Sequence, residues 1–180
     1  TLLKNRPRFT PPPIWEEAQL QKGQYLVMTM HRPANVDEET KLKQFMQAIL
    51  DNVQGLPVVF PVHPRTAKIL SRLGIEASHL HLIGPLPYLE FNYLVEHSKA
   101  VLTDSGGITE ETTVMGIPCL TLRDNTERPE TITEGTNELI GTDPVHIPPA
   151  LQRLFSGNWK TGAIPEKWDG KTGERIVEAL

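Results

Sequence analysis

A four-residue run with paired glycines is the part of the sequence best suited to holding an anion. It reads Asp104-Ser105-Gly106-Gly107 and joins an apolar segment to one with helical spacing. The free N–H groups and the dipole at a helix start favour an anion, and glycine lets a diphosphate approach the backbone closely. The same pattern fits a tight turn in which Asp104 or Ser105 caps the helix. The spacing matches neither a Walker lysine loop nor the G-x-G-x-x-G fingerprint.

Basic side chains follow several other apolar segments at the point where each segment ends. The histidines and arginines of this set are His31, Arg32, His63, Arg65, Arg123 and Arg128. In a chain whose formal net charge is −4, this local positive charge predicts a phosphorylated ligand. His31 is the candidate for chemistry, because it ends a buried segment beside Arg32 and could protonate a departing phosphate oxygen. Arg128, placed before Pro129 at a predicted helix start, is suited to holding phosphate.

Two adjacent carboxylates, Glu110 and Glu111, lie one turn into the helix that follows the glycine pair. A carboxylate beside a phosphate site makes sense if it accepts hydrogen bonds from sugar hydroxyls, and Glu111 is our candidate for that contact with ribose. The alternative is that both are solvated residues of the kind favoured in the first turn of a helix. The sequence contains no His-Glu-x-x-His or paired-cysteine motif, so no metal site is predicted.

Apolar runs alternate with helically spaced segments along the chain. We predict strands at residues 25–30, 57–62, 80–83, 100–103, 117–122 and 137–141. After a short amphipathic piece at residues 14–20, we predict helices at residues 37–53, 66–73, 88–97, 107–115, 127–134, 148–155 and 170–180, with Asp37 as an N-cap. The start, with Pro7 and three prolines at 11–13, is expected to lack regular structure. The alternation is typical of an α/β domain with a doubly wound parallel sheet, which binds ligands at the carboxyl ends of its strands.

Length and composition favour a single domain with an ordinary core. The chain has 180 residues, of which 38% are hydrophobic and 22% charged, and its acidic balance argues against nucleic acid or an anionic membrane as partner. Its one cysteine, Cys119, lies in an apolar run, which predicts a buried small hydrophobe and a reducing, cytoplasmic setting. No apolar run is long enough to span a bilayer and no signal peptide is visible. Because Thr1 is not a methionine, we expect a chain trimmed from something longer.

Three of these motifs, in this order and spacing, resemble the UDP-N-acetylglucosamine 2-epimerase family. They are Thr-x-His-Arg-x-x-Asn at residues 29–35, Thr-Asp-Ser-Gly-Gly-Ile-Thr-Glu-Glu at 103–111, and Arg123 followed by Thr-Glu-Arg-Pro-Glu at 126–130. The resemblance runs from Tyr25 to Leu180 and includes the closing segments 168–171 and 174–177.

The resemblance implies a fold and a set of site residues. Family members resemble GT-B glycosyltransferases, with two Rossmann-like domains around a cleft and a final helix that crosses back to the first domain. This chain matches the second domain and that helix, which implies a lead-in at 1–23, a UDP-sugar-binding domain at 24–165 and a crossover helix at 166–180. The implied substrate-binding residues are Arg32, Phe91 at the uracil, Ser105, Gly106 and Gly107 at the diphosphate, Glu111 at the ribose and Arg128 at phosphate, with His31 catalytic at the leaving group.

The implied reaction interconverts UDP-GlcNAc and UDP-ManNAc in cell-envelope polysaccharide synthesis. UDP is eliminated in anti fashion to leave a 2-acetamidoglucal, and is then added back with C2 inverted; no metal or nicotinamide cofactor is needed. The implied partners are UDP-GlcNAc or UDP, the first domain and, in the intact enzyme, a second copy in a homodimer. The family's carboxylates for C2 and C3 belong to the first domain, so this chain alone is expected to bind UDP without turnover.

Two departures and three alternatives accompany the resemblance. Members activated by a second UDP-GlcNAc carry His-x-Asn-Pro where this chain has His63-Pro64-Arg65-Thr66, and Leu86 stands where other members often have glutamine. The alternatives are a hydrolysing epimerase that releases ManNAc, a GT-B glycosyltransferase, and a nucleotide-sugar-binding module without catalysis. The motif from Thr126 to Glu130 speaks against the glycosyltransferase.

Overall fold

The structure, a computed structural model, describes the backbone of residues 1–180 and every side chain except that of Ala34. Six parallel strands form one sheet in the order β3-β2-β1-β4-β5-β6. Their bounds are β1 Leu26–Thr29, β2 Val58–Pro61, β3 Leu80–Ile83, β4 Ala100–Thr103, β5 Cys119–Thr121 and β6 Asn137–Leu139. The strand order reverses between β1 and β4, so the predicted doubly wound α/β sheet is confirmed.

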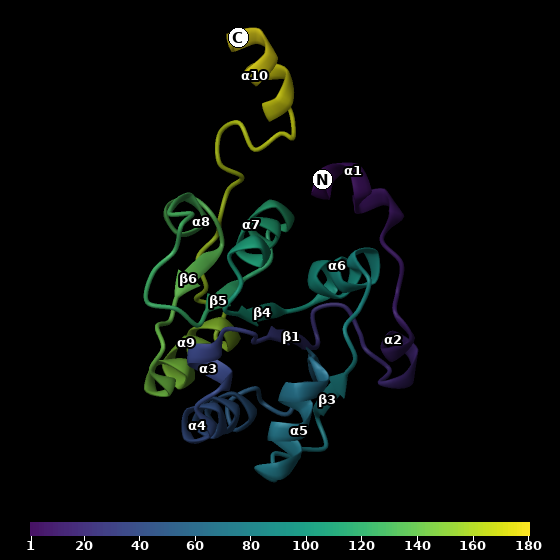
Figure 1. Cartoon of the computed structure of the whole chain (residues 1–180), viewed down its shortest axis with the longest axis vertical. Helices are drawn as coiled ribbons and strands as arrows, with labels where there is room; N and C mark the ends of the chain where they lie inside the picture. Colours follow the sequence, from purple (N-terminus) through teal and green to yellow (C-terminus); the bar gives the residue numbers. More distant parts are fainter.

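Helices cover both faces of the sheet (Figure 1). One face carries α4 (Glu39–Leu50), α5 (Pro64–Arg72) and α9 (Ile147–Phe155), and the other carries α6 (Tyr88–His97) and α7 (Gly106–Met115). Successive strand residues point to opposite faces of the sheet. Leu26 and Met28 therefore pack in a first core cluster, under α4, α5 and α9, and Val27 packs in a second core cluster, under α6 and α7. The central strands are thus buried on both sides, and for this reason their apolar runs are unbroken.

The proline-rich start is more regular than expected, although residues 9–12, with Pro11 and Pro12, lack regular structure as predicted. It forms α1 (Leu2–Asn5), a 3-10 turn η1 (Arg6–Arg8) and α2 (Pro13–Glu17). Proline suits the first turn of a helix, where its missing N–H would be unbonded in any case. In α2, Trp15 packs edge-on against Tyr25, Tyr93 and His97, with ring centroids 5.8, 5.2 and 5.7 Å away, and so holds α2 against α6.

The loops after β1 and β2 also differ from the prediction. A short helix, α3 (Pro33–Val36), precedes α4, and Glu38 rather than Asp37 takes the N-cap position, without a side-chain cap bond. The Asp37 carboxylate instead accepts a hydrogen bond from Arg65, at 3.2 Å. The helix α5 begins two residues earlier than predicted, because His63 caps it: its Nδ1 accepts the N–H of Arg65 at 3.3 Å.

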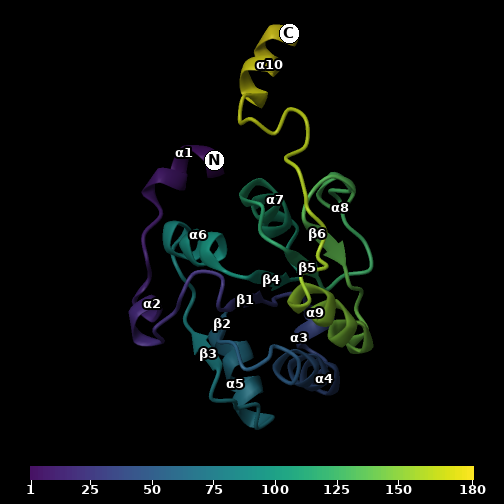
Figure 2. The ribbon, with the colours of Figure 1, turned by 180° about the vertical axis from the view of Figure 1, so that it is seen from behind.

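The end of the chain leaves the body of the molecule. A 3-10 turn η2 (Pro144–His146) leads into α9, and α10 (Thr172–Ala179) projects away from the sheet (Figure 1, Figure 2). No residue of α10 is buried, and Val177 is 74% exposed. No helix in the described chain is both long and apolar enough to cross a membrane. Cys119 is fully buried, as predicted, and burial raises the pKa of its thiol to about 11.

Candidate functional site

The start of α7 is open at the carboxyl edge of the sheet. The strand β4 is buried along its whole length and leads through Asp104 to Ser105, whose N–H donates to Thr103 Oγ1 at 3.0 Å. Ser105 takes the N-cap position of α7, yet its side chain makes no cap hydrogen bond. The Asp104 carboxylate bonds to the loop after β1 instead. The alternative in which one of these two side chains simply caps the helix is therefore wrong.

The glycine pair is not required by the packing of the protein itself. A Cβ added at Gly107 would meet nothing within 4 Å among the described atoms. One added at Gly106 would lie 3.6 Å from Glu127 Oε2 and 3.7 Å from Arg123 Nη1, which is ordinary contact. Glycine costs helix stability relative to alanine. Two glycines in the first turn of α7 therefore indicate that something outside the fold approaches the backbone there.

The Asp104 carboxylate organises the loop after β1. It is fully buried and accepts the N–H groups of His31 (3.1 Å) and Arg32 (2.9 Å) and the side-chain amide of Asn35 (3.1 Å). His31 Nδ1 lies 2.8 Å from Asp104 Oδ1. Because an ionised carboxylate can only accept, Nδ1 carries the proton in this pair, and Nε2 is the ring nitrogen left for another partner.

The same contact brings two predicted site residues to the glycine turn. The His31 side chain is 62% exposed although its Nδ1 is bound, so the ring is anchored and still accessible. Arg32 Nε donates to the carbonyl oxygen of Asp104 at 3.0 Å. The neighbouring strands β1 and β4 make this possible, with Thr29 paired to Thr103 and their hydroxyls 2.7 Å apart. His31 and Arg32 therefore stand beside the start of α7.

Carboxylates compensate most of the positive charge that the strand ends carry. Arg123 is only 4% exposed and binds Glu127 with both Nη atoms, at 2.8 and 2.6 Å, which holds the pKa of Glu127 down to about 2. Arg65 pairs with Asp37. The expected local excess of positive charge is therefore smaller than the sequence indicated, and Arg123 fixes a loop rather than facing a ligand.

The loop that Arg123 fixes carries Arg128. Residues 127–129 lie outside any helix, and α8 spans only Glu130–Thr133, shorter than the predicted helix at 127–134. Arg128 is exposed, its N–H donates to Thr126 Oγ1 at 3.1 Å, and its guanidinium pairs with Glu110 of α7. Arg128, which the sequence predicts to bind phosphate, therefore lies against α7, where the Glu110 carboxylate holds its guanidinium.

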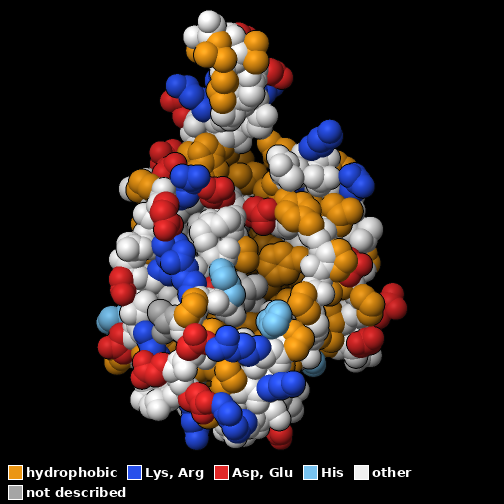
Figure 3. Space-filling view, viewed as in Figure 1, with side chains coloured by type: hydrophobic (Ala, Val, Ile, Leu, Met, Phe, Trp, Pro, Cys, Tyr) orange, Lys and Arg blue, Asp and Glu red, His pale blue; other side chains and the backbone are white. Residues whose placement is uncertain are grey.

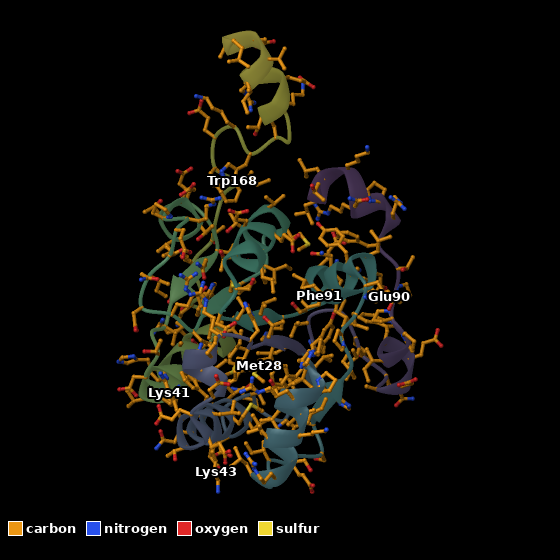
Figure 4. The ribbon with its side chains drawn as sticks, viewed as in Figure 1. Met28, Lys41, Lys43, Glu90, Phe91 and Trp168 are labelled. Carbon is orange, nitrogen blue, oxygen red and sulfur yellow. The ribbon has the colours of Figure 1, made fainter. Side chains whose placement is uncertain are left out.

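The helices α6 and α7 bring Phe91 and Glu111 to the same side of the sheet. Phe91 is a half-buried residue of α6 that packs on the second core cluster together with Ile108 of α7 (Figure 4). Glu111 Oε1 accepts a hydrogen bond from Tyr88 of α6 at 2.8 Å. Burial raises the pKa of Glu111, while the hydrogen bond from Tyr88 and the nearby Asn92 side chain act in the opposite direction.

The face that carries these residues is hollowed. Figure 3 shows hydrophobic side chains at the bottom of a hollow near the middle of the molecule, with histidine side chains beside it. A cavity of about 400 Å³ lies at the carboxyl ends of β1 and β2, and its lining includes Met30, His31, Asp37, His63, Arg65 and Thr66. His63 therefore borders the same space as His31, although its Nδ1 caps α5.

Sequence reasoning missed the residues that hold the others in place. Asp104 was considered only as part of the anion-binding run or, alternatively, as a helix cap, and Tyr88 carries no signal of its own because a tyrosine in an amphipathic helix is ordinary. The Asp104 contact had one usable signal: a charged residue directly after a buried strand, beside a second strand that also ends in a polar motif. The pairing of β1 with β4 was needed to join the two.

Comparisons with known proteins identify the family of the chain. The UDP-N-acetylglucosamine 2-epimerase family matches residues 2–180. The UDP-N-acetylglucosamine 2-epimerase of Methanocaldococcus jannaschii is 37% identical over 165 residues, 87% of this chain and 44% of that protein. The crystal structure of the M. jannaschii enzyme in complex with UDP-GlcNAc and UDP is similar with a TM-score of 0.72, at 37% identity, and the match covers 87% of this chain and 44% of that one.

A relative with a different substrate in its name also matches. The UDP-2,3-diacetamido-2,3-dideoxy-D-glucuronate 2-epimerase of Pseudomonas aeruginosa is 40% identical over 118 residues, 65% of this chain and 33% of that protein. The chain spans less than half the length of these curated relatives. Because the family matches nearly the whole length of this chain, the chain belongs to the UDP-N-acetylglucosamine 2-epimerase family.

Proposed function

We propose that this chain is the UDP-binding C-terminal domain of a non-hydrolysing epimerase that interconverts UDP-GlcNAc and UDP-ManNAc. The observation that carries the proposal is the uncapped start of α7, where two glycines that the fold does not need stand beside an anchored histidine. A helix start of this kind binds a diphosphate through its N–H groups and its dipole. The relatives whose structures hold UDP-GlcNAc and UDP support the same ligand.

The helices α6 and α7 supply the remaining contacts that we propose for the nucleotide. With the diphosphate on Ser105, Gly106 and Gly107, Glu111 lies one turn further along α7, where its carboxylate can accept ribose hydroxyls. The ring of Phe91 on the adjacent α6 offers an apolar surface for uracil. We assign Arg128 to phosphate, which requires its guanidinium to share or leave Glu110.

His31 is assigned to the leaving group. In the elimination, the bond from C1 to the β-phosphate oxygen breaks, UDP takes the electron pair, and a base removes the proton from C2. A protonated His31 would give the Nε2 proton to the departing oxygen while Nδ1–H stays on Asp104. The buried carboxylate stabilises the imidazolium that this role requires, as the aspartate of a catalytic triad does. The base for C2 is expected from the domain that precedes this one in the intact enzyme.

Titration of this chain with UDP in a calorimeter tests the binding half of the proposal. We expect weak binding that Arg128→Ala and Ser105→Ala reduce, because a hydrogen bond to a charged group is worth about 1.5–3 kcal/mol. The ion pair of Arg153, in α9, with Glu138 of the edge strand β6 gives the matched control Arg153→Ala. If the first two variants leave a measured affinity unchanged, the placement of the diphosphate is wrong.

Product analysis of the intact protein tests the catalytic half. Incubation with UDP-GlcNAc, followed by NMR of the sugar anomeric protons, is expected to show UDP-ManNAc and no accumulation of free sugar. Free ManNAc with UDP would identify a hydrolysing enzyme. Transfer of the sugar to an acceptor, or no reaction at all, would support the glycosyltransferase or the binding module. We expect the intact enzyme to be a homodimer, which light scattering coupled to gel filtration measures.

A further inference from the structure

We infer that Tyr88 is a positioning residue that makes the site selective for a ribonucleotide over a deoxyribonucleotide. The inference rests on the proposed function, in which Glu111 contacts the ribose. Tyr88 is the first residue of α6, and its hydroxyl donates to Glu111 Oε1 at 2.8 Å across the boundary between α6 and α7. The tyrosine is 38% exposed, so its hydroxyl lies at the surface of the crevice and not in the core.

A second group on α6 supports the same carboxylate. Asn92 is fully buried one turn after Tyr88, and its Nδ2 donates to the Tyr88 carbonyl oxygen at 3.1 Å. The Asn92 side chain also lies near enough to Glu111 to lower the pKa of its carboxyl. The Glu111 carboxylate is therefore held from α6 by the Tyr88 hydroxyl, with the Asn92 amide beside it.

A carboxylate fixed in this way can discriminate between ligands. An ionised carboxylate accepts about four hydrogen bonds and donates none, so the capacity that Tyr88 leaves free selects for donors such as a ribose hydroxyl. Because Glu111 is already immobilised, a hydroxyl that binds it loses less side-chain entropy. Phe91 lies three residues after Tyr88 and therefore on the same side of α6, so the base and the sugar are recognised by one face of this helix.

The hydrogen bonds from α6 also keep Glu111 able to accept. Burial raises the pKa of Glu111, and the charge of Glu110 adds to that effect, whereas the Tyr88 and Asn92 contacts lower it. Removing the Tyr88 hydroxyl would thus both release the carboxylate and favour its protonated form, which is a poorer acceptor. Both effects weaken the contact with a ribose hydroxyl and leave the contacts with the base and the diphosphate unchanged.

The test is a comparison of ligands that differ by one hydroxyl. The dissociation constants of UDP, 2′-deoxy-UDP and 3′-deoxy-UDP are measured by calorimetry for the unchanged chain, Tyr88→Phe, Glu111→Gln and the control Tyr93→Phe. Tyr93 lies on the same helix, where its ring stacks on His97. We expect the unchanged chain and the control to prefer UDP over at least one deoxy analogue by about 10-fold, the value of one charge-assisted hydrogen bond. Tyr88→Phe should reduce that preference to less than about 3-fold with little change in the affinity for the analogue.

Two results would overturn the inference in distinguishable ways. Equal losses of affinity for UDP and the deoxy analogues in Tyr88→Phe would show a purely structural role for the tyrosine, and an unchanged preference would show no role in selectivity. Either result leaves UDP binding, and therefore the proposed function, intact. A chain that does not bind UDP at all would instead overturn the proposed function, and the inference would fall with it. Thermal unfolding of each variant checks that the fold is retained.

Discussion

Replacing Gly107 by alanine should make the protein more stable and its nucleotide site weaker. Gly107 is the second residue of α7, and a Cβ there would meet nothing within 4 Å among the described atoms. Alanine is the better helix former, so we expect a gain of about 0.5 kcal/mol at this first-turn position, or roughly 1–2 °C in Tm. The same methyl group would stand between a diphosphate and the backbone N–H groups, and the loss of one such contact is worth about 10- to 100-fold in Kd.

The opposite signs of the two effects make the experiment decisive. Stability is measured by thermal unfolding without ligand, and affinity by calorimetric titration with UDP. Gly173→Ala is the matched control, because Gly173 also lies in the first turn of a helix, α10, and a Cβ there would likewise meet nothing described within 4 Å. The control should leave UDP affinity unchanged. An unchanged affinity in Gly107→Ala would refute the argument that a ligand explains the glycine pair.

Three further outcomes are expected. In the intact enzyme, His31→Ala should lower kcat for UDP-GlcNAc more than it raises the Kd for UDP; equal losses would make His31 a binding residue only. Glu110→Gln should strengthen UDP binding about 2- to 5-fold by releasing Arg128 from its ion pair, and a weaker affinity would contradict the phosphate role. The Glu127 carboxyl should titrate by NMR near pH 2 and return towards its usual range in Arg123→Gln. Because its folded pKa is depressed, the pair stabilises the fold above the ordinary glutamate pKa and the contribution is lost as pH falls through about 2.

The sequence predicts the sheet because the strands carry their own signal. Val58, Val59 and Phe60 are fully buried, as are the residues of β4, so these central strands are recognisable without knowledge of their neighbours. The carboxyl ends of parallel strands share one edge. This shared edge predicts that His31 lies beside the turn at 104–107, and the contacts of His31 with Asp104 confirm it.

The sequence does not predict which charges meet across loops. Arg123 reads as a phosphate ligand until the structure shows both its Nη atoms on Glu127, and the ion pair of Arg128 with Glu110 could not be predicted either. Such pairs depend on side-chain directions at loop residues, where no periodicity constrains the backbone. The start of α5 was misplaced for a related reason, since His63 is not among the usual capping residues.

The pairing of β1 with β4 also determines when the site can form during folding. The two strands are neighbours although Thr29 and Thr103 are 74 residues apart in sequence, so closing the sheet at this point requires a long loop to be ordered first. The His31 loop and the glycine turn lie on opposite sides of that junction, so the two come together only when β1 and β4 pair. A nucleotide at 1,000 times its Kd should therefore add its full stabilisation of about 4.1 kcal/mol to global unfolding. Amide exchange of the two central strands would report that gain directly.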